Sequence, residues 1–268
     1  MDFILGLSNL LLLNFEGFVL FLNQSSIIIT WLFFLFFCLI IILLLLKIFG
    51  EIGIYIYTVL AIIAANIQVL KIVNFPFFEN PIALGTILFS TTFLATDILT
   101  EYYGSNYARK NILIGFISFL IMTIFMLFTL GFSPIDENSV GEDYAWAIQT
   151  QNNLLAIFMP FPTLFVASMI AYLFSQYFDV WFYEKLYNFT NKKYLWLRNN
   201  LSTMISALLD NIIFSLFAWI ILNPNPLDFN TVLFTFILGT YILRVIIAIF
   251  DTPFIYLAKY FMPNKVNE

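Results

Sequence analysis

The sequence predicts an all-α polytopic membrane protein: a helical bundle of about six core transmembrane helices, with one or two extra helices at the N-terminus. Of its 268 residues, 62% are hydrophobic and only 10% are charged, whereas soluble domains average about 25% charged residues. Uncharged stretches such as 27–46 and 112–130 reach the ~20 residues that a bilayer requires. Five charged side chains nevertheless lie within or beside such stretches: Asp97, Glu101, Asp210, Arg244 and Asp251.

Several apolar segments have the length of a membrane span. The N-terminal segment 3–22 is weaker, because Asn14 and Glu16 interrupt it; we expect a span there, with an interfacial helix as the alternative. Pro160 and Pro162 predict a kink or break in the fifth of the stronger segments. The stronger segments are 28–49, 53–73, 82–100, 111–132, 154–178, 201–222 and 231–257.

The placement of Lys and Arg predicts the orientation, because cytoplasmic loops carry an excess of both. Arg109 and Lys110 open the connection after segment 82–100, and the connection 179–200 holds four more basic residues. We therefore expect a cytoplasmic C-terminus. The predicted division is 1–49 as extra N-terminal membrane segments, 50–262 as the core bundle and 263–268 as a cytoplasmic tail.

Composition argues against several classes of function. The chain has no histidine, the commonest metal ligand, and Cys38 has no second cysteine to pair with. No GxxxxGK[ST] phosphate loop is present, and no basic stripe interleaved with aromatic residues suggests nucleic-acid binding. We expect no enzyme, no catalytic residue, no cofactor, no metal site and no nucleic-acid partner.

The buried charges indicate a polar site between helices, because a charge at bilayer depth costs roughly 2.5–3.5 kcal/mol on insertion scales. Asp97 and Glu101 are four residues apart and share one helix face. Arg244 and Asp251 share a face of the last segment, and Arg244 is expected to pair with Asp210 or Asp97. The alternative is that these groups only hold the helices together.

Further polar residues are candidates on weaker grounds. Asn66 and Asn211 lie at depth, where an amide can contact a ligand or join two helices. Another group flanks the connection 179–200 and could form a gate or a clasp, or simply be solvated: Gln176, Asp179, Arg198, Asn199 and Asn200.

Five short motifs stand in order along the chain. They read TDILTEYYG at 96–104, SQYFDV at 175–180, YLWLRNNLST at 194–203, LDNIIF at 209–214 and DTPF at 251–254. Together, over about residues 54–262, the chain resembles the queuosine-precursor transporter family of vitamin-uptake-type bacterial membrane proteins. It departs from the common pattern at Asn211, where threonine is frequent.

The resemblance implies a six-span core over 53–257, similar to the substrate-binding subunits of energy-coupling-factor vitamin transporters. It implies a multi-pass protein of the bacterial cytoplasmic (inner) membrane that imports 7-cyano-7-deazaguanine, 7-aminomethyl-7-deazaguanine or queuine for salvage into tRNA modification. The partners would be this nucleobase and the lipid bilayer. Homo-oligomerisation, a partner ATPase module, proton coupling through a buried carboxylate and facilitated diffusion stay open.

The candidate residues suit such a substrate. A 7-deazaguanine presents a ring N–H beside an exocyclic amine, and Asp97 or Asp210 could accept both in a bidentate pair. Asp251 or Glu101 would favour a cationic aminomethyl group. The ring carbonyl could be bound by Asn66, Asn211 or Arg244.

Two other classes of function compete with transport. Asp97 and Asp210 could form the acid dyad of an intramembrane enzyme, although no GxGD sequence surrounds either residue. A non-transporting membrane scaffold would use the same polar residues only for helix packing.

Overall fold

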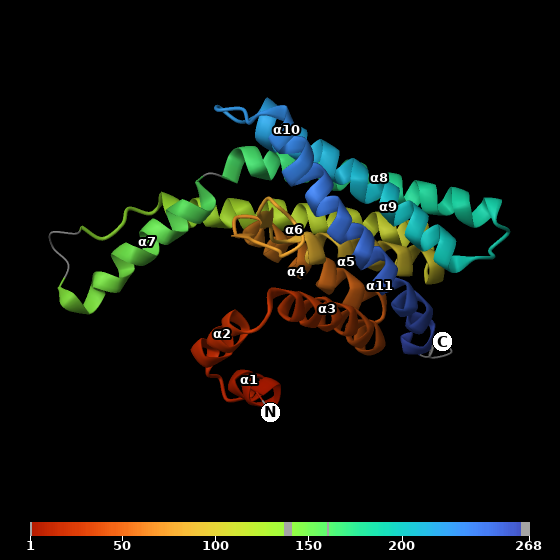
Figure 1. The fold of residues 1–268 in the computed structure, drawn as a ribbon, viewed down its shortest axis with the longest axis horizontal. Coiled ribbons are helices and arrows are strands. Elements are labelled where there is room, and N and C mark those ends of the chain that lie inside the picture. The colour runs from red at the N-terminus through yellow and green to blue at the C-terminus, as the bar shows by residue number, and fades with distance from the viewer. Residues whose placement is uncertain (1, 137–140, 160, 264–268) are drawn as a thin grey trace.

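The computed structural model describes residues 2–136, 141–159 and 161–263. It confirms the all-α membrane fold, with long helices lying side by side (Figure 1). Within the described residues, six helical stretches are long and apolar enough to cross a membrane. The long helices are α3 (Ile27–Phe49), α4 (Glu51–Gln68), α5 (Thr86–Tyr102), α6 (Ser105–Gly131), α8 (Phe161–Phe189), α9 (Leu195–Leu216) and α11 (Thr240–Phe261).

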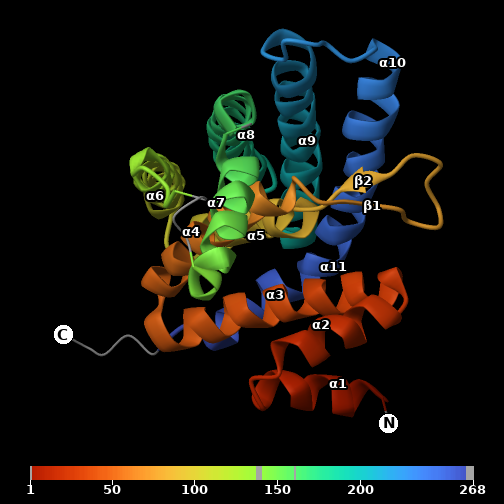
Figure 2. The ribbon, with the colours of Figure 1, turned by 90° about the vertical axis from the view of Figure 1, so that its left-hand side faces the viewer.

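The predicted span over 3–22 is wrong. Two short helices occupy this region, α1 (Asp2–Leu11) and α2 (Phe15–Gln24), joined by a turn in which Leu13 has φ 58° and Asn14 accepts a hydrogen bond from the backbone of Gly17. Each helix has 10 residues, or about 15 Å at 1.5 Å per residue, half of the ~30 Å hydrocarbon core. The pair lies on the side of α3 that faces away from the bundle (Figures 1 and 2).

The predicted span 82–100 begins too early. Ile82–Ala83 forms β2, which pairs antiparallel with β1 (Ile72–Val73), so the connection between α4 and α5 is a small hairpin. Gly85 then takes φ 98°, a left-handed conformation that glycine tolerates best, and α5 follows with 17 residues. Gly104, at φ 100°, separates α5 from α6, so Arg109 and Lys110 lie within α6 and not in a connection.

The predicted span 154–178 is also displaced. A helix over Ala145–Phe158, α7, ends before the proline pair, and α8 continues to Phe189, so that the spanning stretch is Thr163–Phe189. Pro160 itself lies outside the described residues. The connection to α9 is therefore only residues 190–194, because the apolar and aromatic residues after Asp179 extend the helix.

Two π-helical segments lie at the opposite end of the bundle from this connection. The first, η2 (Phe217–Ile221), continues α9, and the second, η3 (Val232–Gly239), leads from the short α10 (Phe229–Thr231) into α11. π-Helical turns are rare and occur frequently at functional sites. The C-terminal third of the chain therefore forms two long helical stretches, α9–η2 and α10–η3–α11. The π-helical turns of both lie near the same end of the bundle.

Helix α5 lies at the centre of the bundle. It packs against α3, α4, α6, α8, α9 and α11, and its residues from Thr86 to Leu99 are buried except Phe89. Many of these buried residues are polar, as are those of α9. The helices around α5 therefore surround a polar interior, while α3, α4 and α6 contribute mainly to the apolar core.

Gly115 marks the closest approach of α6 to its neighbours. A Cβ atom at this position would lie 2.4 Å from Ile62 Cδ1 and 2.7 Å from the hydroxyl of Tyr172. Both of those side chains are buried and have little room to move. A larger residue at this position would therefore have to displace the ends of both side chains where α4, α6 and α8 meet.

We predict that Gly115→Leu destabilises the bundle by about 1–3 kcal/mol, the usual cost of overpacking a core. The melting temperature of the detergent-solubilised protein checks this. Gly131→Leu is the matched control, since a Cβ at Gly131 would meet nothing within 4 Å. Equal melting temperatures for the two variants would contradict the packing argument.

Candidate functional site

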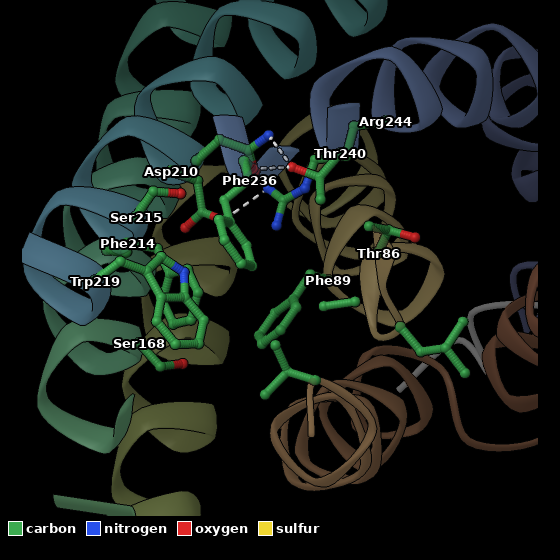
Figure 3. A pocket seen from close by; sticks show the side chains of 15 residues that line it. Thr86, Phe89, Ser168, Asp210, Phe214, Ser215, Trp219, Phe236, Thr240 and Arg244 are labelled. Carbon is green, nitrogen blue, oxygen red and sulfur yellow. Dashed lines mark hydrogen bonds and ion pairs between the residues drawn. The ribbon is translucent and has the colours of Figure 1, made fainter. Parts of the chain in front are cut away.

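A pocket lies between α5, α8, α9 and α11, near the end of the bundle that carries the β1–β2 hairpin and the two π-helical segments (Figure 3). Its empty space is about 560 Å³ when the open side is included, and within it a volume of about 50 Å³ can hold the centre of a water molecule. Val69, Ala83 and Leu84 border it from the α4–α5 connection. Its polar lining residues are Thr86, Ser168, Asp210, Asn211, Ser215, Thr240 and Arg244.

A buried ion pair forms one wall of this pocket. Arg244 Nη1 on α11 lies 2.6 Å from Asp210 Oδ2 on α9, which confirms the pairing expected from the sequence. Ser175 on α8 donates a hydrogen bond of 2.9 Å to the other oxygen of Asp210, Oδ1. The Arg244 guanidinium also lies 5.9 Å from the centroid of the Phe89 ring. Four helices thus fix the position of one carboxylate and one guanidinium.

Aromatic rings form the other walls. Trp219 of η2 and Phe236 of η3 pack with their ring centroids 4.7 Å apart, and Trp219 and Phe89 lie on opposite sides of the pocket (Figure 3). Phe214 lines it as well. Such faces suit a flat heterocycle, because base–aromatic stacking is worth roughly 1–3 kcal/mol per base.

Three polar atoms of the lining have no hydrogen-bond partner among the described residues. They are Arg244 Nε, Trp219 Nε1 and Ser215 Oγ. A buried donor left unpaired costs about 1–3 kcal/mol, so its presence in a pocket points to a ligand that completes it. The pocket can therefore offer a carboxylate acceptor beside several donors, between aromatic faces.

The two asparagines predicted from the sequence, Asn211 and Asn66, make different kinds of hydrogen bond. Asn211 lines the pocket, but its amide donates to the Ile237 carbonyl at 3.1 Å and to the Thr240 hydroxyl at 2.8 Å, which ties α9 to η3 and α11. Asn66 donates to the Ile62 carbonyl within its own helix and does not line the pocket.

Asp97 and Asp251 lie outside the pocket lining, in a second buried group with Asp179 that we call the carboxyl cluster. All three carboxylates have 0% exposure. Thr203 donates to Asp97 at 3.3 Å, and Asn199 donates to Asp251 at 3.0 Å. Arg244 and Asp251 are seven residues apart on α11, and Ser175 and Asp179 are four apart on α8, so the cluster lies roughly 6–10 Å from the ion pair along the bundle.

A third polar layer closes the other end of the bundle. Arg198 binds Glu101 through Nε (2.9 Å) and Nη2 (2.5 Å), and its Nη1 donates to the carbonyls of Lys192 and Lys193. The Tyr183 hydroxyl donates to Glu101 at 2.7 Å. We call this arrangement the Arg198–Glu101 clasp. It joins α5, α8 and α9 beside the connection 190–194.

The residues expected to form one gate are thus distributed over several contacts. Arg198 belongs to the clasp, whereas Asp179 and Asn199 belong to the carboxyl cluster. Gln176 joins α8 to α5, donating to Thr92 at 2.9 Å and accepting from Thr96 at 3.1 Å. Asn200 joins α9 to Thr252 of α11 at 2.6 Å.

Sequence reasoning missed several pocket residues. Ser168 and Ser175 on α8 are seven apart, so they share a face with each other, and Asp179 is four beyond Ser175. That periodicity was a usable signal for the polar face of α8. Trp219 and Phe236 gave none, since aromatic residues near span ends are ordinary in membrane proteins.

Comparison with known proteins agrees with the motifs. The profile of a family described as "Putative vitamin uptake transporter" matches residues 83–258. A protein of Bacillus subtilis (strain 168) named "Probable queuosine precursor transporter" is 33% identical over 235 residues, which cover 87% of this chain and 95% of that protein. No solved structure shows a significant match. The chain therefore belongs to the vitamin-uptake-type family to which its queuosine-precursor transporter motifs pointed, and it is a multi-pass membrane transporter.

Proposed function

We propose that this chain imports queuosine precursors, the 7-deazaguanines 7-cyano-7-deazaguanine, 7-aminomethyl-7-deazaguanine or queuine, across the bacterial cytoplasmic membrane. The observation that carries the proposal is the buried Asp210–Arg244 pair on the wall of an aromatic pocket, in a chain whose relative is named a queuosine precursor transporter. The C-terminus would be cytoplasmic, as the Lys and Arg distribution predicts.

The chemistry of the pocket supports a 7-deazaguanine. A carboxylate has about four lone-pair sites, so Asp210 keeps acceptor capacity beyond its bonds to Ser175 and Arg244 for the ring N–H and the exocyclic amine. The unpartnered Nε of Arg244 could donate to the ring carbonyl. Trp219 and Phe89 would hold the flat ring between them. Of the two carboxylates first considered for this role, Asp210 is favoured because Asp97 does not line the pocket.

In this proposal the substrate passes along the bundle towards the Arg198–Glu101 clasp. The pocket lies by the connections that we expect outside the cell, and the clasp lies by the basic connection 190–194. The precursor would cross chemically unchanged and then be used for tRNA modification. The proposal is tested by expressing the chain in a bacterium that lacks both precursor synthesis and its own importer, and measuring the queuosine content of its tRNA. Each precursor would be supplied in turn at low concentration.

We predict that Asp210→Asn lowers uptake in that assay at least tenfold. An amide offers one acceptor oxygen and no charge, so it loses the bidentate pairing and leaves Arg244 without its counter-ion. Asp228→Asn is the control: it also removes one carboxylate charge, but at an exposed helix cap. Membrane content is measured for both variants. Normal queuosine levels with Asp210→Asn would remove Asp210 from the site.

We predict that Trp219→Ala raises the apparent KM for uptake by roughly 5- to 150-fold, the equivalent of the ~1–3 kcal/mol of a stacking contact. Trp219→Phe should retain most of the affinity because it keeps an aromatic face. Trp196→Ala serves as the control, since Trp196 is 51% exposed at the other end of the bundle. If Trp219→Ala and Trp196→Ala gave the same KM, stacking on Trp219 would be excluded.

A further inference from the structure

The carboxyl cluster lies in the bundle interior between the pocket and the clasp and is used by neither. Asp97, Asp179 and Asp251 come from α5, α8 and α11, and each has 0% exposure. Asp97 interacts electrostatically with both of the others, and the Asp97 and Asp179 carboxyl groups face each other directly. Three acidic groups from three helices are therefore buried close to one another.

Within the part of the chain that the structure describes, no lysine or arginine pairs with these three carboxylates. Arg198 is bound by Glu101 and Arg244 by Asp210. The groups that α9 presents to the cluster are neutral: Asn199, Ser202, Thr203 and Ser206. From α8, Tyr183 also faces Asp97, and it too is uncharged as a phenol. Three like charges without a counter-ion are strongly unfavourable in a dry interior.

Unpartnered atoms provide a second, independent observation. Both oxygens of Asp179, Oδ1 of Asp97 and Oδ2 of Asp251 have no hydrogen-bond partner in the described part of the chain. The buried hydroxyl of Ser206 faces Asp179, yet it also makes no hydrogen bond of good geometry. The hydroxyls of Ser202 and Ser206 can turn towards Asp179, but the facing oxygens of Asp97 and Asp179 can only accept, so a hydrogen bond between these two groups needs a hydrogen that neither carboxylate supplies. A protonated carboxyl group supplies it.

The cluster is mechanically linked to the pocket. On α8, Ser175 binds Asp210 and Asp179 lies one turn further along. On α9, Ser206 precedes Asp210 by one turn, and on α11 Asp251 follows Arg244 by about two. The three helices that form the ion-pair wall of the pocket thus also position Asp179, Asp251 and the Ser206 that faces Asp179, while Asp97 comes from α5. A shift of these helices when the pocket fills or empties would change the separation of the carboxyl groups.

We propose that the Asp97–Asp179–Asp251 cluster is the proton-binding site through which the transporter couples substrate import to an inward proton gradient. The inference rests on the proposed function for its substrate. A proton from the outer side binds a carboxylate of the cluster and neutralises it while the pocket is loaded. The same proton leaves to the cytoplasmic side once the clasp opens, which restores the carboxylate for the next cycle.

The test uses the full chain in liposomes with 7-cyano-7-deazaguanine, which is neutral, so its own charge does not respond to the gradient. With the outside acidic, wild-type protein should accumulate the compound several-fold over equilibrium, and adding it should acidify the lumen, read with a trapped pH-sensitive dye. Asp179→Asn should reduce accumulation at least tenfold, whereas the exposed-carboxylate control Asp228→Asn should behave as wild type. Size-exclusion chromatography establishes that the variants fold.

Two results with wild-type protein would overturn the inference, whatever the variants do. In the first, the compound enters the liposomes only up to its external concentration and the lumen is not acidified, which indicates facilitated diffusion. The other is accumulation driven by a sodium gradient at equal pH, which would make the coupling ion sodium.

Failure of the proposed function gives a different pattern. Exchange of labelled for unlabelled compound across the liposome membrane, with no gradient, tests substrate recognition alone. If no exchange occurs, the compound is not a substrate of this protein. The cluster is then judged by infrared spectroscopy of the membrane-embedded protein. A protonated carboxyl band in wild type that weakens in Asp97→Asn, Asp179→Asn and Asp251→Asn supports proton binding, and a spectrum without that band at any pH overturns it.

Discussion

The low polarity of the membrane interior is the constraint on which the rest of this structure depends. A polar side chain in hydrocarbon has no water to bind, so it must find its partner within the protein. The chain meets this requirement by turning the polar faces of α5, α8, α9 and α11 towards one another. The apolar faces of α3, α4 and α6 cover much of the outside of that polar interior. Polar groups such as Asn111 and Thr58, which lie on α6 and α4, bind each other at 2.9 Å.

The polar interior is ordered in three layers along the bundle. The Asp210–Arg244 pocket lies by the π-helical segments, the carboxyl cluster lies roughly 6–10 Å further along, and the Arg198–Glu101 clasp lies at the far end. Each charge of the first and third layers has a counter-ion, whereas the middle layer has none among the described residues. This difference separates the middle layer from groups that only hold helices together, because purely structural polar contacts are expected to be satisfied.

Two carboxylates that are close in sequence make different contacts because they lie one helical turn apart along α5. Asp97 and Glu101 are one helical turn apart, and the sequence suggested one shared site for both. Asp97 meets Thr203, Asp179 and Asp251 in the cluster, whereas Glu101 meets Arg198 and Tyr183 in the clasp. A rise of about 6 Å between them is enough to move a carboxylate from one layer to the next. The spacing left Asp210 and Asp97 open as partners of Arg244, and the structure pairs it with Asp210.

Hydropathy and charge in the sequence determined the fold class, most of the membrane spans and nearly all the charged residues of the interior, because each depends on composition and short-range periodicity. The failures were local: the β1–β2 hairpin before α5, the turn at Leu13 and Asn14, and the extension of α8 to Phe189. Only the tertiary structure decided which carboxylate faces which partner, and which aromatic residues line a pocket instead of facing lipid. The rotation of each helix about its axis is set by packing against all its neighbours, and no single segment of sequence contains that information.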